Sequence, residues 1–186
     1  MDARLAGLLR HSREPMLAQL RLSWWRESLG RDSAEWPAGE PLLVALRSWN
    51  GQHGALTALV DGWEAMTGPA PLPTQALQAM AQGRGDAFAA LAQVLQRDGE
   101  IESARRLGSQ WSLADVAIRL GNSEERAAAS SVAIERREPL PRVSRSLRPL
   151  LVLSGLARHN LDRGNTGAAI SPAAMLKALR LGLLGF

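Results

Sequence analysis

The stretch 14-EPMLAQLRLSWWRESLG-30 decides the fold class, because its apolar residues follow a strong helical pattern. It also places an arginine among those apolar residues. Pro15 suits the first turn of a helix, where its missing N–H leaves no bond unmade. Arg21 falls between Leu17 and Trp25, inside an apolar arc of about 240° at 100° per residue. The arc consists of Met16, Leu17, Ala18, Leu20, Leu22, Trp24, Trp25 and Leu29. The pattern predicts a mostly enclosed helix that carries an arginine.

A guanidinium group in that position needs partners, because an unpaired buried charge costs several kcal/mol. One interpretation is that Arg21 pairs with a carboxylate from another helix or stacks on Trp25. The other is that Arg21 faces an internal cavity. This helix alone does not separate the two interpretations.

The same helical period continues along nearly the whole chain, and alternating strand-like runs are absent. A Pro-rich break covers residues 68–73, and Thr74 is expected to cap the helix that follows it. Asn122 or Ser123 caps a later helix, and Ser171 caps the last one ahead of Pro172. We predict helices over residues 2–10, 15–29, 40–49, 53–66, 74–82, 85–97, 100–120, 123–136, 142–162 and 172–184. Neither a repeat nor a long linker interrupts the series, so residues 1–186 are predicted to form one all-α domain.

The composition excludes several classes of site. The chain has no cysteine, and its three histidines (His11, His53 and His159) form no pair with metal-ligand spacing. No apolar run reaches the roughly 18 to 20 residues that span a bilayer. The arginine-rich segment 135–148 contains no nucleic-acid motif, in a chain of net charge +4. We interpret this segment as a solvated face, or one that rests on anionic lipid, and expect no nucleic-acid partner.

Four segments carry a resemblance, and they occur in the same order as in the family concerned: EPMLAQLRLSWWRESL (14–29), RGDAFAALAQVL (84–95), RLGSQWSLADVAIRL (106–120) and LPRVSRSLRPLLVLSGLARHNL (140–161). Together they resemble the helices of the squalene/phytoene synthase family. The resemblance implies an isoprenoid-synthase-like helical bundle around a deep apolar cavity. In that family, two aspartate-rich motifs at the cavity mouth hold Mg²⁺ against the diphosphates of two prenyl substrates, which are then joined. Mg²⁺ suits this role because it takes hard oxygen ligands and neutralises the leaving group.

The sequence departs from the family at both aspartate motifs. Counted back from the Trp24–Trp25 pair, the first motif falls on Ala6, Gly7 and Arg10, and the second falls on Arg119 and Ser123. Two carboxylate positions have become arginine, which should repel Mg²⁺. We therefore expect no catalytic residue and no metal ligand, with Mg²⁺ as a cofactor only if the family activity is retained. The chain also starts almost on the first motif, so the predicted bundle is N-terminally shortened.

Without a metal, Arg21 is expected to neutralise an internal acid such as Asp115. The residues that we expect to line a cavity or contact a ligand are Arg21, Trp24, Trp25 and Asp115. The expected ligand is a prenyl group or another lipid.

Three functions follow as hypotheses. The first is a non-enzymatic assembly factor or lipid-binding scaffold with a protein partner, because a mitochondrial branch of the family assists complex I assembly and also lacks the motifs. The second is an active prenyl transferase of carotenoid or hopanoid synthesis, which the missing aspartates oppose. The third is a helical interaction module without a ligand, against which a pocket would count. The expected location is cytoplasmic, with peripheral contact to the inner membrane as an option.

Overall fold

The computed structural model describes residues 1–11, 14–164 and 171–186, and this part of the chain is all-α with no strand. The prediction of an all-α fold is therefore confirmed. The helices are α1 (Asp2–His11), α2 (Pro15–Gly30), α3 (Pro41–Leu46), α4 (Thr57–Ala65), α5 (Thr74–Val94), α6 (Ile101–Arg119), α7 (Ser123–Glu135), α8 (Arg148–Asp162) and α9 (Pro172–Leu183). No helix in the described ranges is long and apolar enough to cross a bilayer.

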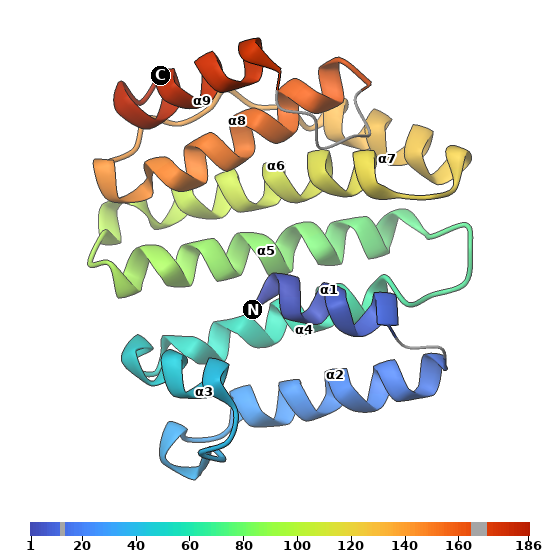
Figure 1. Cartoon of the computed structure of the whole chain (residues 1–186), viewed down its shortest axis with the longest axis vertical. Helices are drawn as coiled ribbons and strands as arrows, with labels where there is room; N and C mark the ends of the chain where they lie inside the picture. The colour runs from blue at the N-terminus through green and yellow to red at the C-terminus, as the bar shows by residue number, and fades with distance from the viewer. Residues whose placement is uncertain (12–13, 165–170) are drawn as a thin grey trace.

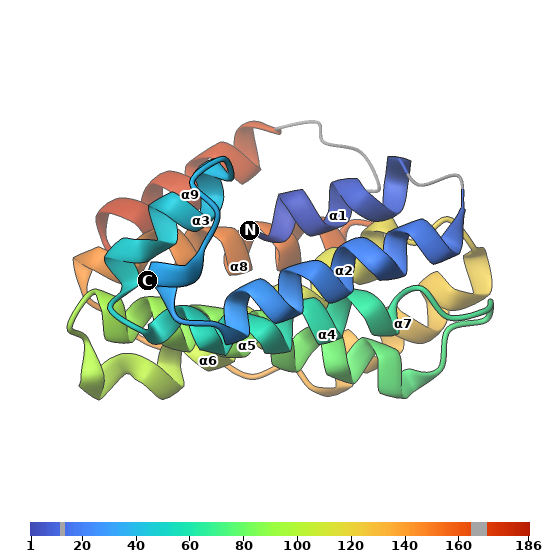
Figure 2. The same ribbon diagram turned by 90° about the horizontal axis from the view of Figure 1, so that it is seen from below.

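Six of the described helices form a layered array that follows the chain order. Figure 1 shows α2, α4, α5, α6, α8 and α9 lying side by side, each packed on the next. Helix α1 lies over α4 on one side of the array and packs against α2 and α4 (Figure 1 and Figure 2). The apolar core is correspondingly divided into clusters between successive helices. This arrangement places α5 and α6 in the middle and leaves α2 and α9 at the two ends.

Two of the three predicted helix caps are present, whereas Thr74 is the first residue of α5 and its side chain forms no cap. The Asn122 side chain accepts hydrogen bonds from the backbone N–H groups of Glu124 and Glu125 at the start of α7. Ser171 accepts from the N–H of Ala174, and Pro172 occupies the first turn of α9. Both predicted helix starts are confirmed.

The predicted break between residues 82 and 85 is wrong, because α5 runs without interruption from Thr74 to Val94. Glycines cause the misreading. A Cβ atom on Gly83 would lie less than 3.0 Å from the carbonyl oxygen of Ala58 on α4, and one on Gly85 less than 3.0 Å from the hydroxyl of Ser109 on α6. These glycines therefore allow close helix packing and do not end a helix.

The predicted enclosure of α2 is also wrong. Ala18, Leu22, Trp25 and Leu29 are buried, and they occupy one side of the apolar arc. The other side faces outward and consists of Met16, Leu17, Leu20 and Trp24, which are 42 to 70% exposed. Since α2 lies at the end of the array, α1 and α4 cover only part of its apolar surface.

Candidate functional site

The most highly connected polar group of the described chain is the guanidinium of Arg84, which is 3% exposed in the middle of α5. Its Nε and Nη2 donate to the two carboxylate oxygens of Asp2 on α1, at 2.9 and 3.0 Å. Its Nη1 donates to Oδ2 of Asp115 on α6 at 3.1 Å. A single buried arginine therefore joins three helices, with the bidentate geometry that guanidinium groups favour.

Two tryptophans complete the surroundings of Arg84. Its Cζ lies 4.2 Å from the ring centroid of Trp111 and 5.3 Å from that of Trp63, within the range of cation–π attraction. The indole N–H of Trp63 donates to Oδ1 of Asp2 at 2.9 Å. The remaining oxygen of Asp115 accepts from Nε of Arg119 at 2.7 Å. Both carboxylates are thus fully engaged by cations of the protein itself.

This cluster forms part of the wall of a cleft of about 650 Å³ between α1, α4, α6 and the start of α7, which we name the α1–α6 cleft. Its volume falls in the range typical of small-molecule sites. Most of the other lining residues are apolar, and they include Ala6, Leu9, Met66, Val116, Ile118 and Leu120. The cleft therefore offers an apolar interior beside a charged cluster.

The cleft carries a surplus of positive charge. Arg10, Arg84, Arg119 and Arg126 line it, against the carboxylates of Asp2 and Asp115 alone. Arg126 donates to the backbone oxygens of Leu120 and Gly121 at 2.9 and 3.3 Å. Neither Arg10 nor Arg126 forms an ion pair with a carboxylate in the part of the chain that the structure describes. The charges of these two guanidinium groups are therefore not matched by a carboxylate of the described residues.

The four predicted site residues do not come together. Asp115 borders the α1–α6 cleft, whereas Arg21, Trp24 and Trp25 border a separate hollow of about 360 Å³ beside Glu40. Arg21 is exposed and forms no hydrogen bond or ion pair within the described residues. The expected pairing of Arg21 with Asp115 is therefore wrong. The acid is neutralised by Arg84 and Arg119, which lie closer to it in the array.

Sequence reasoning missed Arg84, Asp2, Trp63 and Trp111. The available signal was the sequence Gly83–Arg84–Gly85 within a helical pattern. Glycine in a helix interior costs roughly 0.5–1 kcal/mol relative to alanine, so two of them indicate close packing around the residue between them. The partner Asp2 lies 82 residues away, and no local pattern indicates that pairing.

The Mg²⁺ implied by the family resemblance does not fit these residues. The carboxylates of Asp2 and Asp115 accept from Arg84, Arg119 and Trp63, so a metal would have to displace guanidinium groups. No group of three His, Cys, Asp or Glu side chains able to hold a metal occurs in residues 1–11, 14–164 and 171–186. The arginines that line the cleft can instead contact an anion directly, because guanidinium groups bind anionic oxygens without a metal.

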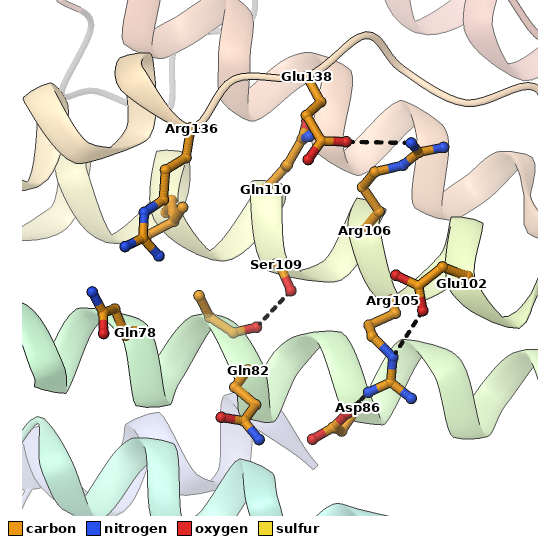
Figure 3. A pocket seen from close by; sticks show the side chains of 12 residues that line it. Gln78, Gln82, Asp86, Glu102, Arg105, Arg106, Ser109, Gln110, Arg136 and Glu138 are labelled. Atoms are coloured by element: carbon orange, nitrogen blue, oxygen red, sulfur yellow. Dashed lines mark hydrogen bonds and ion pairs between the residues drawn. The ribbon is translucent and has the colours of Figure 1, made fainter.

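A second hollow, of about 560 Å³, lies between α5, α6 and the segment after α7 (Figure 3). Its charges are matched: Arg105 contacts Asp86 and Glu102, and Arg106 pairs with Glu138 at 3.2 Å. Because these charges are paired, the hollow has no preference for an anionic or a cationic ligand. The α1–α6 cleft is therefore the stronger candidate site.

No protein-family model, curated protein or solved structure matches the chain. The function is consequently argued from the geometry of the cleft and from the sequence resemblance.

Proposed function

We propose that the protein binds an amphiphile with an anionic head group and a long apolar tail, of which a prenyl diphosphate is the example, without a metal ion. The observation that carries the proposal is that Arg10 and Arg126, which pair with no carboxylate of the described residues, line a cleft whose other lining residues are mostly apolar. Their charge is not offset, because Arg84 and Arg119 already occupy both nearby carboxylates.

The head group is expected to lie at the exposed rim of the cleft. Arg10 and Arg119 are both exposed, and guanidinium groups bind phosphate oxygens in bidentate fashion. The tail would follow the apolar wall formed by Leu9, Met66 and Ile118. Such burial contributes about 25 cal/mol per Å² of apolar surface removed from water.

The resemblance adds an independent reason to favour this ligand. Arg10 and Arg119, which fall on aspartate positions of the squalene/phytoene synthase motifs, both line the same cleft. In the proposal, arginine side chains replace the metal ions as the partners of the head group. The protein then holds its ligand as a non-enzymatic scaffold and does not join prenyl groups.

Calorimetric titration of the full chain tests the ligand class. Farnesyl diphosphate is titrated in EDTA and again with Mg²⁺, and farnesol and inorganic diphosphate are titrated separately. We expect similar affinity in EDTA and Mg²⁺, and at least tenfold weaker binding of the two fragments. Binding that requires Mg²⁺ would support the metal-dependent transferase instead, and no binding at all would support an interaction module without a ligand.

Charge-removing variants locate the site. The double variant Arg10→Gln/Arg126→Gln removes the free cations of the cleft but leaves the Arg84 ion pairs in place. We expect it to weaken farnesyl diphosphate at least tenfold. The matched control is Arg21→Gln/Arg145→Gln, which removes two exposed arginines outside the cleft and should bind normally. Equal affinity of the two variants would reject the cleft as the site.

A further inference from the structure

Helix α9 carries its large apolar side chains on the outside. Ala174 and Leu181 are buried against the rest of the array, and Leu181 packs over Gly155 of α8. The exposed apolar side chains are 54 to 69% accessible and comprise Met175, Leu176, Leu179, Leu183, Leu184 and Phe186, which we name the α9 surface. In an ordinary surface helix the large apolar residues face the core.

The residues of the α9 surface form a continuous stripe. At 100° per residue, Met175, Leu179, Leu183 and Leu176 follow one another within an arc of about 100°. Figure 1 places α9 at the end of the array, with α8 as its neighbour on one side. A contiguous exposed apolar stripe of this kind marks a contact with a partner or a membrane.

The charges around the α9 surface are cationic. Lys177, Arg180, Arg142 and Arg158 line a hollow of about 530 Å³ together with Phe186, and no acidic side chain is among the described residues that line it. Residues 171–186 contain no Asp or Glu. Burial lowers the pKa of Lys177, and the neighbouring Arg158 and Arg180 lower it further, whereas Asp162 opposes the shift. Three arginines, with Arg137 as the third, and one carboxylate therefore act on this lysine.

Charge complementarity decides whether the α9 surface contacts a second copy of the chain or a membrane. In a symmetric dimer through this surface, the same cations would face one another, which like-charge repulsion disfavours. An anionic bilayer suits both the apolar stripe and the cations of the α9 surface. Its acyl region can take up the leucine side chains, and its phosphates can pair with the lysine and the arginines. The helix has 12 residues and is about 18 Å long, which suits a position in the plane of the interface.

We propose that the α9 surface docks the protein onto an anionic lipid bilayer, with Lys177 and Arg180 at the level of the head-group phosphates. This inference does not depend on the ligand of the α1–α6 cleft. The docking face differs from the α2 stripe of Met16 and Leu20, which is equally apolar but carries the exposed carboxylate of Glu27 on the same side of the helix, whereas residues 171–186 contain no acidic side chain.

Vesicle co-sedimentation of the full chain tests the proposal. Vesicles of pure phosphatidylcholine are compared with vesicles containing about a third phosphatidylglycerol. We expect at least tenfold more bound protein on the anionic vesicles. Leu176→Ser/Leu179→Ser and Lys177→Gln/Arg180→Gln should each reduce that binding at least fivefold. Circular dichroism should stay unchanged, because none of the four side chains is among the buried residues of the described chain.

Matched control variants separate vesicle binding through the α9 surface from binding through α2 or through the α1–α6 cleft. Met16→Ser/Leu20→Ser removes equally exposed side chains from α2 and should bind anionic vesicles normally. Arg10→Gln/Arg126→Gln, which alters the cleft, should also bind normally, so failure of the proposed ligand site leaves this result intact. Equal binding to neutral vesicles, or loss of binding only in the α2 or cleft variant, would overturn the proposal. So would sedimentation velocity showing a dimer that Leu176→Ser/Leu179→Ser converts to monomer.

Discussion

Arg84 and Arg21 show how the position of an arginine in the array decides its energetic role. Arg84 lies in the central helix, where two carboxylates and two indole rings surround it. Arg21 lies on the end helix, where its guanidinium is exposed and unpaired within the described residues. Their surroundings predict opposite responses to the same substitution.

Replacement of each arginine by methionine measures this contrast, because methionine keeps most of the aliphatic volume. Arg84→Met leaves Asp2 and Asp115 without their shared partner, and removal of one member of a buried ion pair costs about 3–5 kcal/mol. That is a large share of a typical total stability of about 5–15 kcal/mol. Arg21→Met should cost less than about 1 kcal/mol, as for exposed charges. Urea denaturation of both variants checks the order, and a smaller loss for Arg84→Met would contradict the structure.

At the scale of the element, α5 depends on glycines that a local pattern misreads. Gly83, Gly85 and Gly108 lie at the contacts between α4, α5 and α6, where a Cβ atom would meet backbone or side-chain atoms of the next helix. Such contacts bring the backbones close together, and this closeness is what buries Arg84. The packing of three helices therefore depends on residues without side chains.

Two alanine substitutions test this role of glycine. Gly83→Ala forces a methyl group against the Ala58 carbonyl and should destabilise the protein by about 1–3 kcal/mol, the usual range for overpacking. Gly30→Ala at the end of α2 is the control, since apart from its chain neighbours and the backbone of its own helix no atom of the described residues lies within 4 Å of its Cβ position. There the substitution should add about 0.4–1 kcal/mol of stability by restricting the unfolded chain. Thermal unfolding would contradict the packing argument if both variants shifted the melting temperature in the same direction.

These elements also show what the sequence could predict. Helical periodicity and caps predicted the all-α class and most helix positions, because both are local properties. The burial of α2 was overestimated, since a 240° apolar arc says nothing about how many neighbours cover it. Asp115 was singled out, but its partner Arg84 and the second acid of the cluster, Asp2, were not. The ion pair between Asp2 and Arg84 joins residues 82 positions apart, so it follows from the packing of the helices and not from the pattern of any one helix.

At the scale of the whole molecule, the array has a protected middle and exposed ends. Helices α5 and α6 are covered on both sides, whereas α2 and α9 each have an outward apolar face. Helix α1 lies against one side of the array and is held to its centre by Asp2, which binds both Arg84 and Trp63. Local stability should therefore fall from the middle of the array toward α1 and the two end helices.

Hydrogen exchange measured by mass spectrometry tests this gradient and the part that Asp2 plays in it. In the wild type, the amides of α5 and α6 should exchange slowest, because they open only with global unfolding. Asp2→Asn weakens the two charge-assisted bonds to Arg84 while keeping the size of the side chain, so α1 should exchange at least tenfold faster. Glu35→Gln is the control, since it removes an exposed carboxylate far along the chain from this contact.

We expect the exchange of α5 to change less than that of α1 in the Asp2 variant. Equal acceleration of both helices would mean that Asp2 supports the fold as a whole, and unchanged exchange in α1 would mean that its apolar contacts, led by the buried Leu5, hold it without the ion pair.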